Sequence, residues 1–156
     1  MNSVLIGGYT LIEYILISNG VYDVLCALSI LWFYNIYPFS ELAKLHMNMF
    51  DSKADRNNPQ VRRLMAYWVF TYGLVRTLSG LHNDKTLNFM AVLTYYIEGS
   101  VFLNEILVNK MVKDKTYFVV ISSFFLGVLV NFRSTSPLPW INYWIKLIHI
   151  LGVLGF

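Results

Sequence analysis

Long apolar runs divide the chain into four segments, which cover residues 11–33, 64–81, 86–108 and 116–132. A helix needs about 20 apolar residues to cross the hydrocarbon core of a bilayer. We therefore expect each run to form a transmembrane helix. Because the later connections are short, we expect neighbouring helices to be antiparallel. The pattern predicts an all-α membrane protein, with a four-helix antiparallel bundle in a single domain over residues 1–156.

The segments outside these runs predict two smaller elements. In the polar connection after the first run, Ser40 is a candidate helix cap, and Leu42, Leu45 and Met49 are spaced as on one helix face. This pattern predicts a short amphipathic helix on the membrane surface. Residues 140–156 follow two prolines, are short for a span and contain Lys and His. We expect them to form a helix that lies in the interface or packs on the bundle.

The connections also indicate how the chain turns and which side its ends face. Residues 18–20, Ser-Asn-Gly, are expected to bend the first helix, and residues 82–85 leave room only for a tight helical hairpin. Basic residues in short loops favour the cytoplasmic side of a membrane. The first and third connections together carry eight Lys and Arg residues, and the opposite side carries three. We therefore expect both termini to face the lumen or the exterior.

Composition supports the membrane assignment and narrows the expected partners. Hydrophobic residues make up 56% of the chain and charged residues 13%, whereas a typical soluble domain is about 25% charged. A soluble chain of 156 residues could not bury this much apolar surface in one core, so lipid must cover the excess. The net charge of +3 comes from loops without a basic stripe, so nucleic acid is not expected to bind. The expected partners are the lipid bilayer and other membrane proteins.

Five ionisable side chains lie inside the predicted spans, where each costs about 2.5 to 3.5 kcal/mol to insert. They should therefore face the interior of the bundle. Glu98 and Glu105 are seven residues apart, so they project within about 20° of each other on one helix face. Counting equally from the hairpin turn places Glu98 about 10 Å deeper than Arg76, which is too far for an easy ion pair. The five residues are Glu13, Asp23, Arg76, Glu98 and Glu105.

Three interpretations of these charges remain open. They could pair or share protons among themselves and fix how the helices pack, with Asp23 able to approach Arg76 or Glu98. They could form a proton path or a catalytic carboxylate, as in enzymes that shift double bonds in lipids. They could also form a polar surface that a helix of another membrane protein completes.

Motifs of soluble enzymes and metal sites are missing from the sequence. It contains no Gly-rich phosphate loop, no nucleophile elbow and no His pair at metal-ligand spacing. His46, His82 and His149 lie in separate loop or interface positions, and Cys26 is the single cysteine. We therefore expect no catalytic residue, no cofactor and no metal, and a protein that is not an enzyme.

Residues 63–108 carry a spaced set of polar and aromatic residues. An Arg is followed by a Trp five positions later and by a second Arg after eight more, and then by a turn that ends in Lys-Thr-Leu. A Thr with an aromatic neighbour and a Phe-Leu-x-Glu block complete the set. In this pattern the chain resembles the small four-span ergosterol biosynthesis scaffold family of the endoplasmic reticulum. The matched residues are Arg63, Trp68, Arg76, Lys85, Thr86, Leu87, Thr94, Tyr95, Phe102, Leu103 and Glu105.

The resemblance implies a protein without chemistry of its own, which holds the sterol C-4 demethylation enzymes together on the endoplasmic reticulum or an ER-derived membrane. It places Glu105 in a helix-packing framework with other matched residues, whereas Glu98 is not part of the family pattern. Two alternatives stay open, a structural membrane component of a virion or organellar complex and a small lipid or sterol isomerase. The residues expected to pack or to contact partners are Asp23, Arg63, Trp68, Arg76, Glu98 and Glu105.

Overall fold

The computed structural model describes residues 5–6, 9–48, 50, 56–108 and 114–133. Within these ranges the chain forms five helices, preceded by a two-residue antiparallel hairpin of β1 (Leu5–Ile6) and β2 (Tyr9–Thr10). The all-α prediction is therefore confirmed in its main feature, and the small hairpin is an addition to it. The C-terminal helix expected over residues 140–156 lies outside the described residues. The helices are α1 (Leu11–Trp32), α2 (Phe39–Met47), α4 (Pro59–His82), α5 (Lys85–Leu107) and α6 (Asp114–Arg133).

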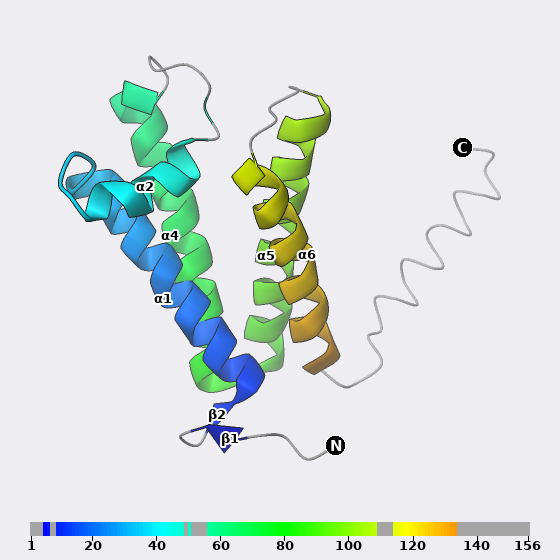
Figure 1. The fold of residues 1–156 in the computed structure, drawn as a ribbon. Helices are drawn as coiled ribbons and strands as arrows, with labels where there is room; N and C mark the ends of the chain where they lie inside the picture. Colours follow the sequence, from blue (N-terminus) through cyan, green and yellow to red (C-terminus); the bar gives the residue numbers. More distant parts are fainter. Residues whose placement is uncertain (1–4, 7–8, 49, 51–55, 109–113, 134–156) are drawn as a thin grey trace, which may run out of the picture.

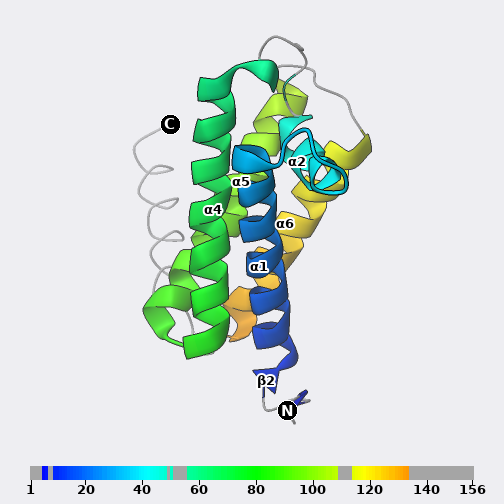
Figure 2. The same ribbon diagram turned by 90° about the vertical axis from the view of Figure 1, so that its left-hand side faces the viewer.

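The four long helices run alternately up and down, as Figure 1 shows. α1 packs most extensively against α4, and α5 against α6, while α4 and α5 share a smaller contact. The bundle therefore consists of two helical pairs, with α1 and α4 on one side and α5 and α6 on the other (Figure 1). α2 packs against α1 near the end of the bundle where the α1 helix stops (Figure 2).

Local sequence explains where the long helices begin and end. Thr10 and Glu13 form a capping box at the start of α1, in which each side chain binds the other residue's backbone N–H. α4 ends at Asn83, whose φ of 47° is the left-handed conformation common at helix C-termini. The next residue, Asp84, caps α5 by accepting hydrogen bonds from two backbone N–H groups. The tight hairpin expected at residues 82–85 therefore consists of a C-cap followed directly by an N-cap.

Two local expectations were wrong. α2 begins at Phe39 after Pro38, so Ser40 lies inside the helix and does not cap it. Residues 18–20 do not bend the chain, because α1 continues through them without a break and runs nearly straight in Figures 1 and 2. The physical reason is that Gly20 lies at a close helix contact, where packing against α4 holds the helical backbone in place.

Glycines bring the backbones of α1 and α4 into contact. A Cβ atom added to Gly20 would lie 2.4 Å from Thr77 Oγ1 and 2.6 Å from the carbonyl oxygen of Gly73. A Cβ on Gly73 would lie 2.7 Å from the carbonyl oxygen of Gly20, and one on Gly80 would lie 2.6 Å from Ile17 Cγ1. Small residues that permit such close approach are a common feature of helix contacts in membranes. The α1–α4 pair therefore depends on the absence of side chains along this seam.

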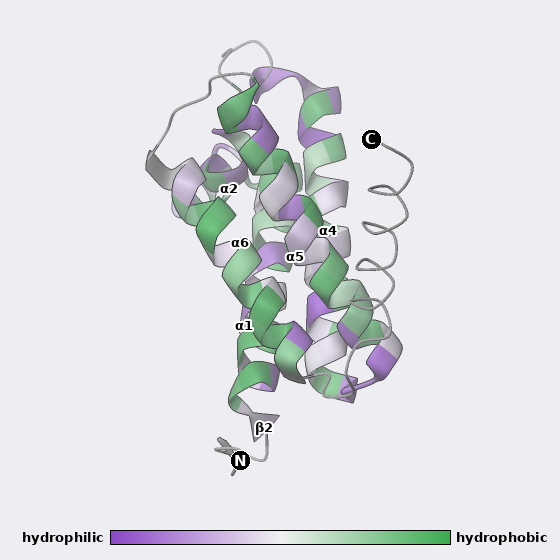
Figure 3. Ribbon diagram, turned by 90° about the vertical axis from the view of Figure 1, so that its right-hand side faces the viewer, coloured by the Kyte–Doolittle hydropathy of each residue, from purple (hydrophilic) through white to green (hydrophobic). Residues whose placement is uncertain are grey.

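Apolar side chains cover the outer faces of the long helices. Figure 3 shows hydrophobic residues along most of α1 and α6, with hydrophilic residues near the ends of α4 and α5. Trp32 and Leu64 at one end, and Phe118 and Phe132 along α6, are all more than two-thirds exposed. Soluble monomers rarely expose contiguous apolar surface on this scale. The distribution fits a protein whose outer surface contacts lipid.

Among the described helices, α1 is the one that is long and apolar enough to cross a bilayer by length and composition, and Thr116–Phe132 of α6 is a shorter apolar helix. In α4 and α5, charged and polar residues such as Arg76 and Glu98 lower the mean hydropathy. Four membrane spans therefore remain a prediction. The ends of the observed helices lie within five residues of the predicted limits, with the largest difference at Pro59, where α4 begins before residue 64.

We expect Gly20→Ala to destabilise the protein by about 1 to 3 kcal/mol, because the new methyl group would overlap the backbone of α4. Gly127→Ala is the matched control, since its Cβ would meet ring atoms of Tyr96 at 3.3 Å instead of backbone. Both substitutions should also stabilise their helices by about 1 kcal/mol, because alanine has a higher helix propensity than glycine. The difference between the two variants in free energy of unfolding therefore measures the clash at Gly20. Thermal unfolding of the purified protein in mild detergent measures it. Equal stability of the two variants would contradict the close α1–α4 seam.

Candidate functional site

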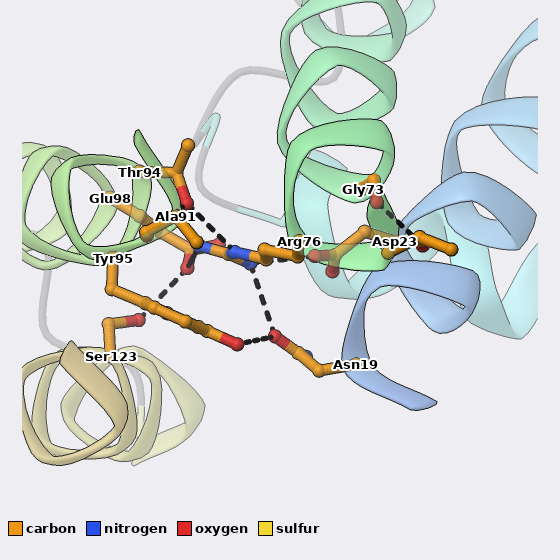
Figure 4. Close-up of polar contacts among 10 residues, drawn as sticks. Asn19, Asp23, Gly73, Arg76, Ala91, Thr94, Tyr95, Glu98 and Ser123 are labelled. Atoms are coloured by element: carbon orange, nitrogen blue, oxygen red, sulfur yellow. Dashed lines mark hydrogen bonds and ion pairs between the residues drawn. The ribbon is translucent and has the colours of Figure 1, made fainter. Parts of the chain in front are cut away.

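Arg76 of α4 lies between the two helical pairs and is 1% exposed. Its Nη1 donates to Asp23 Oδ2 of α1 at 2.6 Å, and its Nη2 donates to Glu98 Oε2 of α5 at 2.8 Å. One guanidinium therefore pairs with carboxylates from both sides of the bundle, as Figure 4 shows. Arginine suits this position because its planar fork presents several donors in fixed directions.

The sequence-based expectation that Glu98 lies too deep to pair with Arg76 is wrong. Counting residues along the helix axes ignores the direction in which side chains lean. Side chains on a helix lean toward its N-terminus. Glu98 therefore leans toward the hairpin turn, while Arg76 on the antiparallel helix leans away from the turn. The two displacements add, and together with the length of the arginine side chain they close the gap.

Hydrogen bonds extend the network to all four long helices. Arg76 Nε donates to Thr94 Oγ1 of α5 at 3.1 Å, and Ser123 Oγ of α6 donates to Glu98 Oε2 at 3.0 Å. On α1, Asn19 Oδ1 accepts from Tyr95 OH at 2.7 Å and from Arg76 Nη1 at 3.4 Å. The polar groups inside the bundle are therefore linked in one continuous network (Figure 4).

Aromatic rings cover the guanidinium. The Cζ atom of Arg76 lies 3.9 Å from the ring centroid of Tyr95 and 5.3 Å from that of Tyr72. Both distances are within the range of cation–π attraction. Trp68 in turn packs edge-on against Tyr72, with ring centroids 5.2 Å apart. The rings therefore add attraction to the guanidinium on the sides that the two carboxylates do not occupy.

The burial of this cluster determines which helix arrangement is possible. Asp23 is 4% exposed and Glu98 9%, so all three charged groups have lost most of their hydration. Desolvation of buried ion pairs roughly cancels their Coulombic attraction, but removing one partner leaves an uncompensated charge. An arrangement that separated the helical pairs would leave such charges in hydrocarbon. The network therefore contributes more to the specificity of packing than to net stability.

The remaining predicted residues lie at other levels along the helices. Arg63 is exposed and precedes Arg76 by 13 positions on the same helix, or about 20 Å. Glu105 is partly buried and lies two turns beyond Glu98. Glu13 belongs to the capping box of α1 instead of the bundle interior. Arg63 therefore lies outside the contacts of Arg76, and Glu98 is the glutamate that pairs with Arg76.

Sequence reasoning missed Asn19 and Ser123 and assigned no role in the network to Thr94, although all three are polar residues in apolar runs. Inserting these small uncharged side chains into a bilayer costs much less free energy than inserting a charge. Their positions were therefore a weaker indication of a buried polar network. Over the part of the chain that the structure describes, no group of three or more His, Cys, Asp or Glu residues could hold a metal ion.

Comparison with protein families identifies a relationship over most of the chain. A family model described as Erg28 like protein matches residues 21–135, a range that includes all of α2, α4, α5 and α6. Neither a curated protein nor a solved structure matches the chain.

We expect Arg76→Met to cost about 3 to 5 kcal/mol of stability, because Asp23 and Glu98 would remain buried without their cationic partner. Combining it with Asp23→Asn and Glu98→Gln should recover a large part of that loss, since no uncompensated charge would remain. Arg63→Met, at an exposed position, is the control and should change stability little. Unfolding in detergent of the four proteins checks this. A triple variant as unstable as Arg76→Met alone would contradict the charge-balance argument.

Proposed function

Because the chain belongs to the Erg28-like protein family, we propose that it is a non-catalytic scaffold of sterol biosynthesis in the endoplasmic reticulum membrane. In this role it holds other membrane proteins together, with the sterol C-4 demethylation enzymes as the expected partners. The family match over residues 21–135 is the observation that carries the proposal. All four long helices cross the bilayer in this proposal, so that Arg76 and its partners lie within the membrane.

The bundle interior supports a role without catalysis. A general base must be able to take up a proton from a substrate. Asp23 and Glu98 are instead held against Arg76 at 2.6 and 2.8 Å. Their ion pairs bridge helices, which is the function expected of a packing network.

A groove near the C-terminal end of α1 supplies a candidate partner surface. It has a volume of about 530 Å³, and Trp32, Arg63 and Tyr67 line it. Trp32 is 68% exposed and Tyr67 55%. Aromatic residues and arginine are the commonest energetic anchors of protein interfaces. Arg63 also belongs to the family pattern yet makes no part of the buried network, so its proposed role is contact with a partner protein.

One observation favours a second function, a lipid or sterol isomerase. Asp23 and Glu98 line the same cavity as His46, and acid and base groups around one cavity are the requirement for moving a proton. Replacement of Glu98 by Gln separates the two functions. A scaffold should keep its partners and support sterol synthesis in this variant, whereas an isomerase that uses Glu98 should lose its activity.

We expect the tagged full-length chain, solubilised in mild detergent from a sterol-producing cell, to recover sterol C-4 demethylation enzymes. Quantitative mass spectrometry against an unrelated multi-span membrane protein measures the enrichment. Arg63→Ala should reduce recovery several-fold without changing thermal stability. Lys44→Ala is the matched control, because Lys44 is an exposed basic residue that pairs with Glu41 on α2. Recovery of no sterol-pathway enzyme by the folded wild-type protein would refute the scaffold function.

A further inference from the structure

A cavity of about 140 Å³ lies beside the Arg76 network. Its walls come from α1, α2, α4, α5 and α6, and Leu45 and His46 line it from α2. Asp23, Arg76 and Glu98 form its polar wall, and Figure 4 shows how these side chains converge from α1, α4 and α5. The cavity is far smaller than the 300 to 1,000 Å³ of typical pockets for whole ligands. It is therefore large enough for the polar end of a molecule but not for a complete lipid.

His46, which lines this cavity, has an unused hydrogen-bonding atom. The residue is 5% exposed, and its Nδ1 has no hydrogen-bond partner within the described part of the chain. Burial lowers the pKa of His46, so at neutral pH its ring is uncharged and has one donor and one acceptor nitrogen. A buried polar atom left without a partner destabilises the folded protein. A bound polar group would remove that destabilisation.

The charges around the cavity favour a ligand that donates hydrogen bonds. Two carboxylates face a single guanidinium, so the polar wall has an excess of acceptor atoms. Ser122 and Ser123 also line the cavity, and their hydroxyl groups already donate to Val119 O and Glu98 Oε2. Their oxygen atoms can still accept. A hydroxyl group fits this wall because it can donate to an acceptor and accept from a neighbour.

Part of the lining of the cavity lies on the outer surface of the bundle, on α1 and α6. Tyr22 of α1 and Phe118 of α6 line it and are 37% and 72% exposed. These exposed rings belong to the apolar face of the protein that contacts lipid. A ligand that enters here keeps its apolar body among the acyl chains and places only its polar end inside.

From these observations we propose that the cavity binds the hydroxyl end of an amphipathic lipid, with His46 Nδ1 as one of its hydrogen-bond partners. The recognised chemistry is a single hydroxyl group on an apolar body, which a sterol or a diacylglycerol can provide. The site is separate from the groove at Arg63, and the proposal does not depend on the scaffold function.

The test measures binding of radiolabelled cholesterol and of radiolabelled dioleoylglycerol to the purified full-length chain in phosphatidylcholine nanodiscs. Unlabelled cholesterol, cholesteryl methyl ether and dioleoylglycerol serve as competitors. We expect the methyl ether, which cannot donate a hydrogen bond, to compete at least tenfold less well than cholesterol. Saturable binding of cholesterol alone would identify the ligand as a sterol. Saturable binding of dioleoylglycerol alone would identify it as a glyceride. Both results support the proposal.

The variant His46→Phe preserves a ring of similar size and removes Nδ1. We expect it to weaken binding about tenfold, as the loss of a hydrogen bond worth about 1.4 kcal/mol predicts. His82→Phe is the matched control, because His82 is an exposed histidine at the far end of α4, and it should bind like the wild type.

The wild-type protein provides a test that does not depend on the folding of a variant. A hydroxyl lipid that binds the folded state should raise the melting temperature with increasing lipid concentration, and the methyl ether should not. Absence of saturable binding by either lipid would overturn the proposal. Where cholesterol binds, equal competition by cholesterol and its methyl ether would also overturn it. Unchanged affinity in a folded His46→Phe protein would also overturn it.

Discussion

The ion pairs of Arg76 with Asp23 and Glu98 are the constraint on which the rest of the bundle depends. They are formed by one residue of α4 that reaches partners on α1 and α5, with Ser123 of α6 attached through Glu98. Because these groups are buried, each must find its partner or leave a charge in an apolar interior. Of the ways in which two apolar helical pairs could pack, the network therefore selects one.

The glycine seam and the charged network act on the same part of α1. Gly20 allows α4 to approach closely, and the flanking Asn19 and Asp23 then lie within reach of Arg76. A larger residue at Gly20 would push the helices apart and lengthen these polar contacts. The close approach of the two backbones and the hydrogen bonding of these polar groups therefore depend on each other. This explains why a Ser-Asn-Gly segment lies inside an apolar helix without bending it.

The distribution of polarity connects this packing to the proposed role. Charged groups inside the bundle are used in internal contacts, the long outer faces are apolar, and exposed aromatic and basic residues gather in a groove near one end. A protein built this way offers its surface to lipid and to other proteins. The cavity at His46 is lined both by the internal network and by exposed aromatic residues, which is why a lipid hydroxyl group is the ligand that suits it.

The sequence by itself determined the helical class, the approximate limits of the long helices, a short helix in the first connection and the family. These follow from local apolar runs, caps and spacing, which need no knowledge of distant contacts. Only the tertiary structure decided that Glu98 pairs with Arg76, that Gly20 marks a contact instead of a bend, and that Arg63 lies outside the network. These features depend on how closely antiparallel helices approach and how far their side chains reach toward one another. Residue spacing along the chain does not specify these distances.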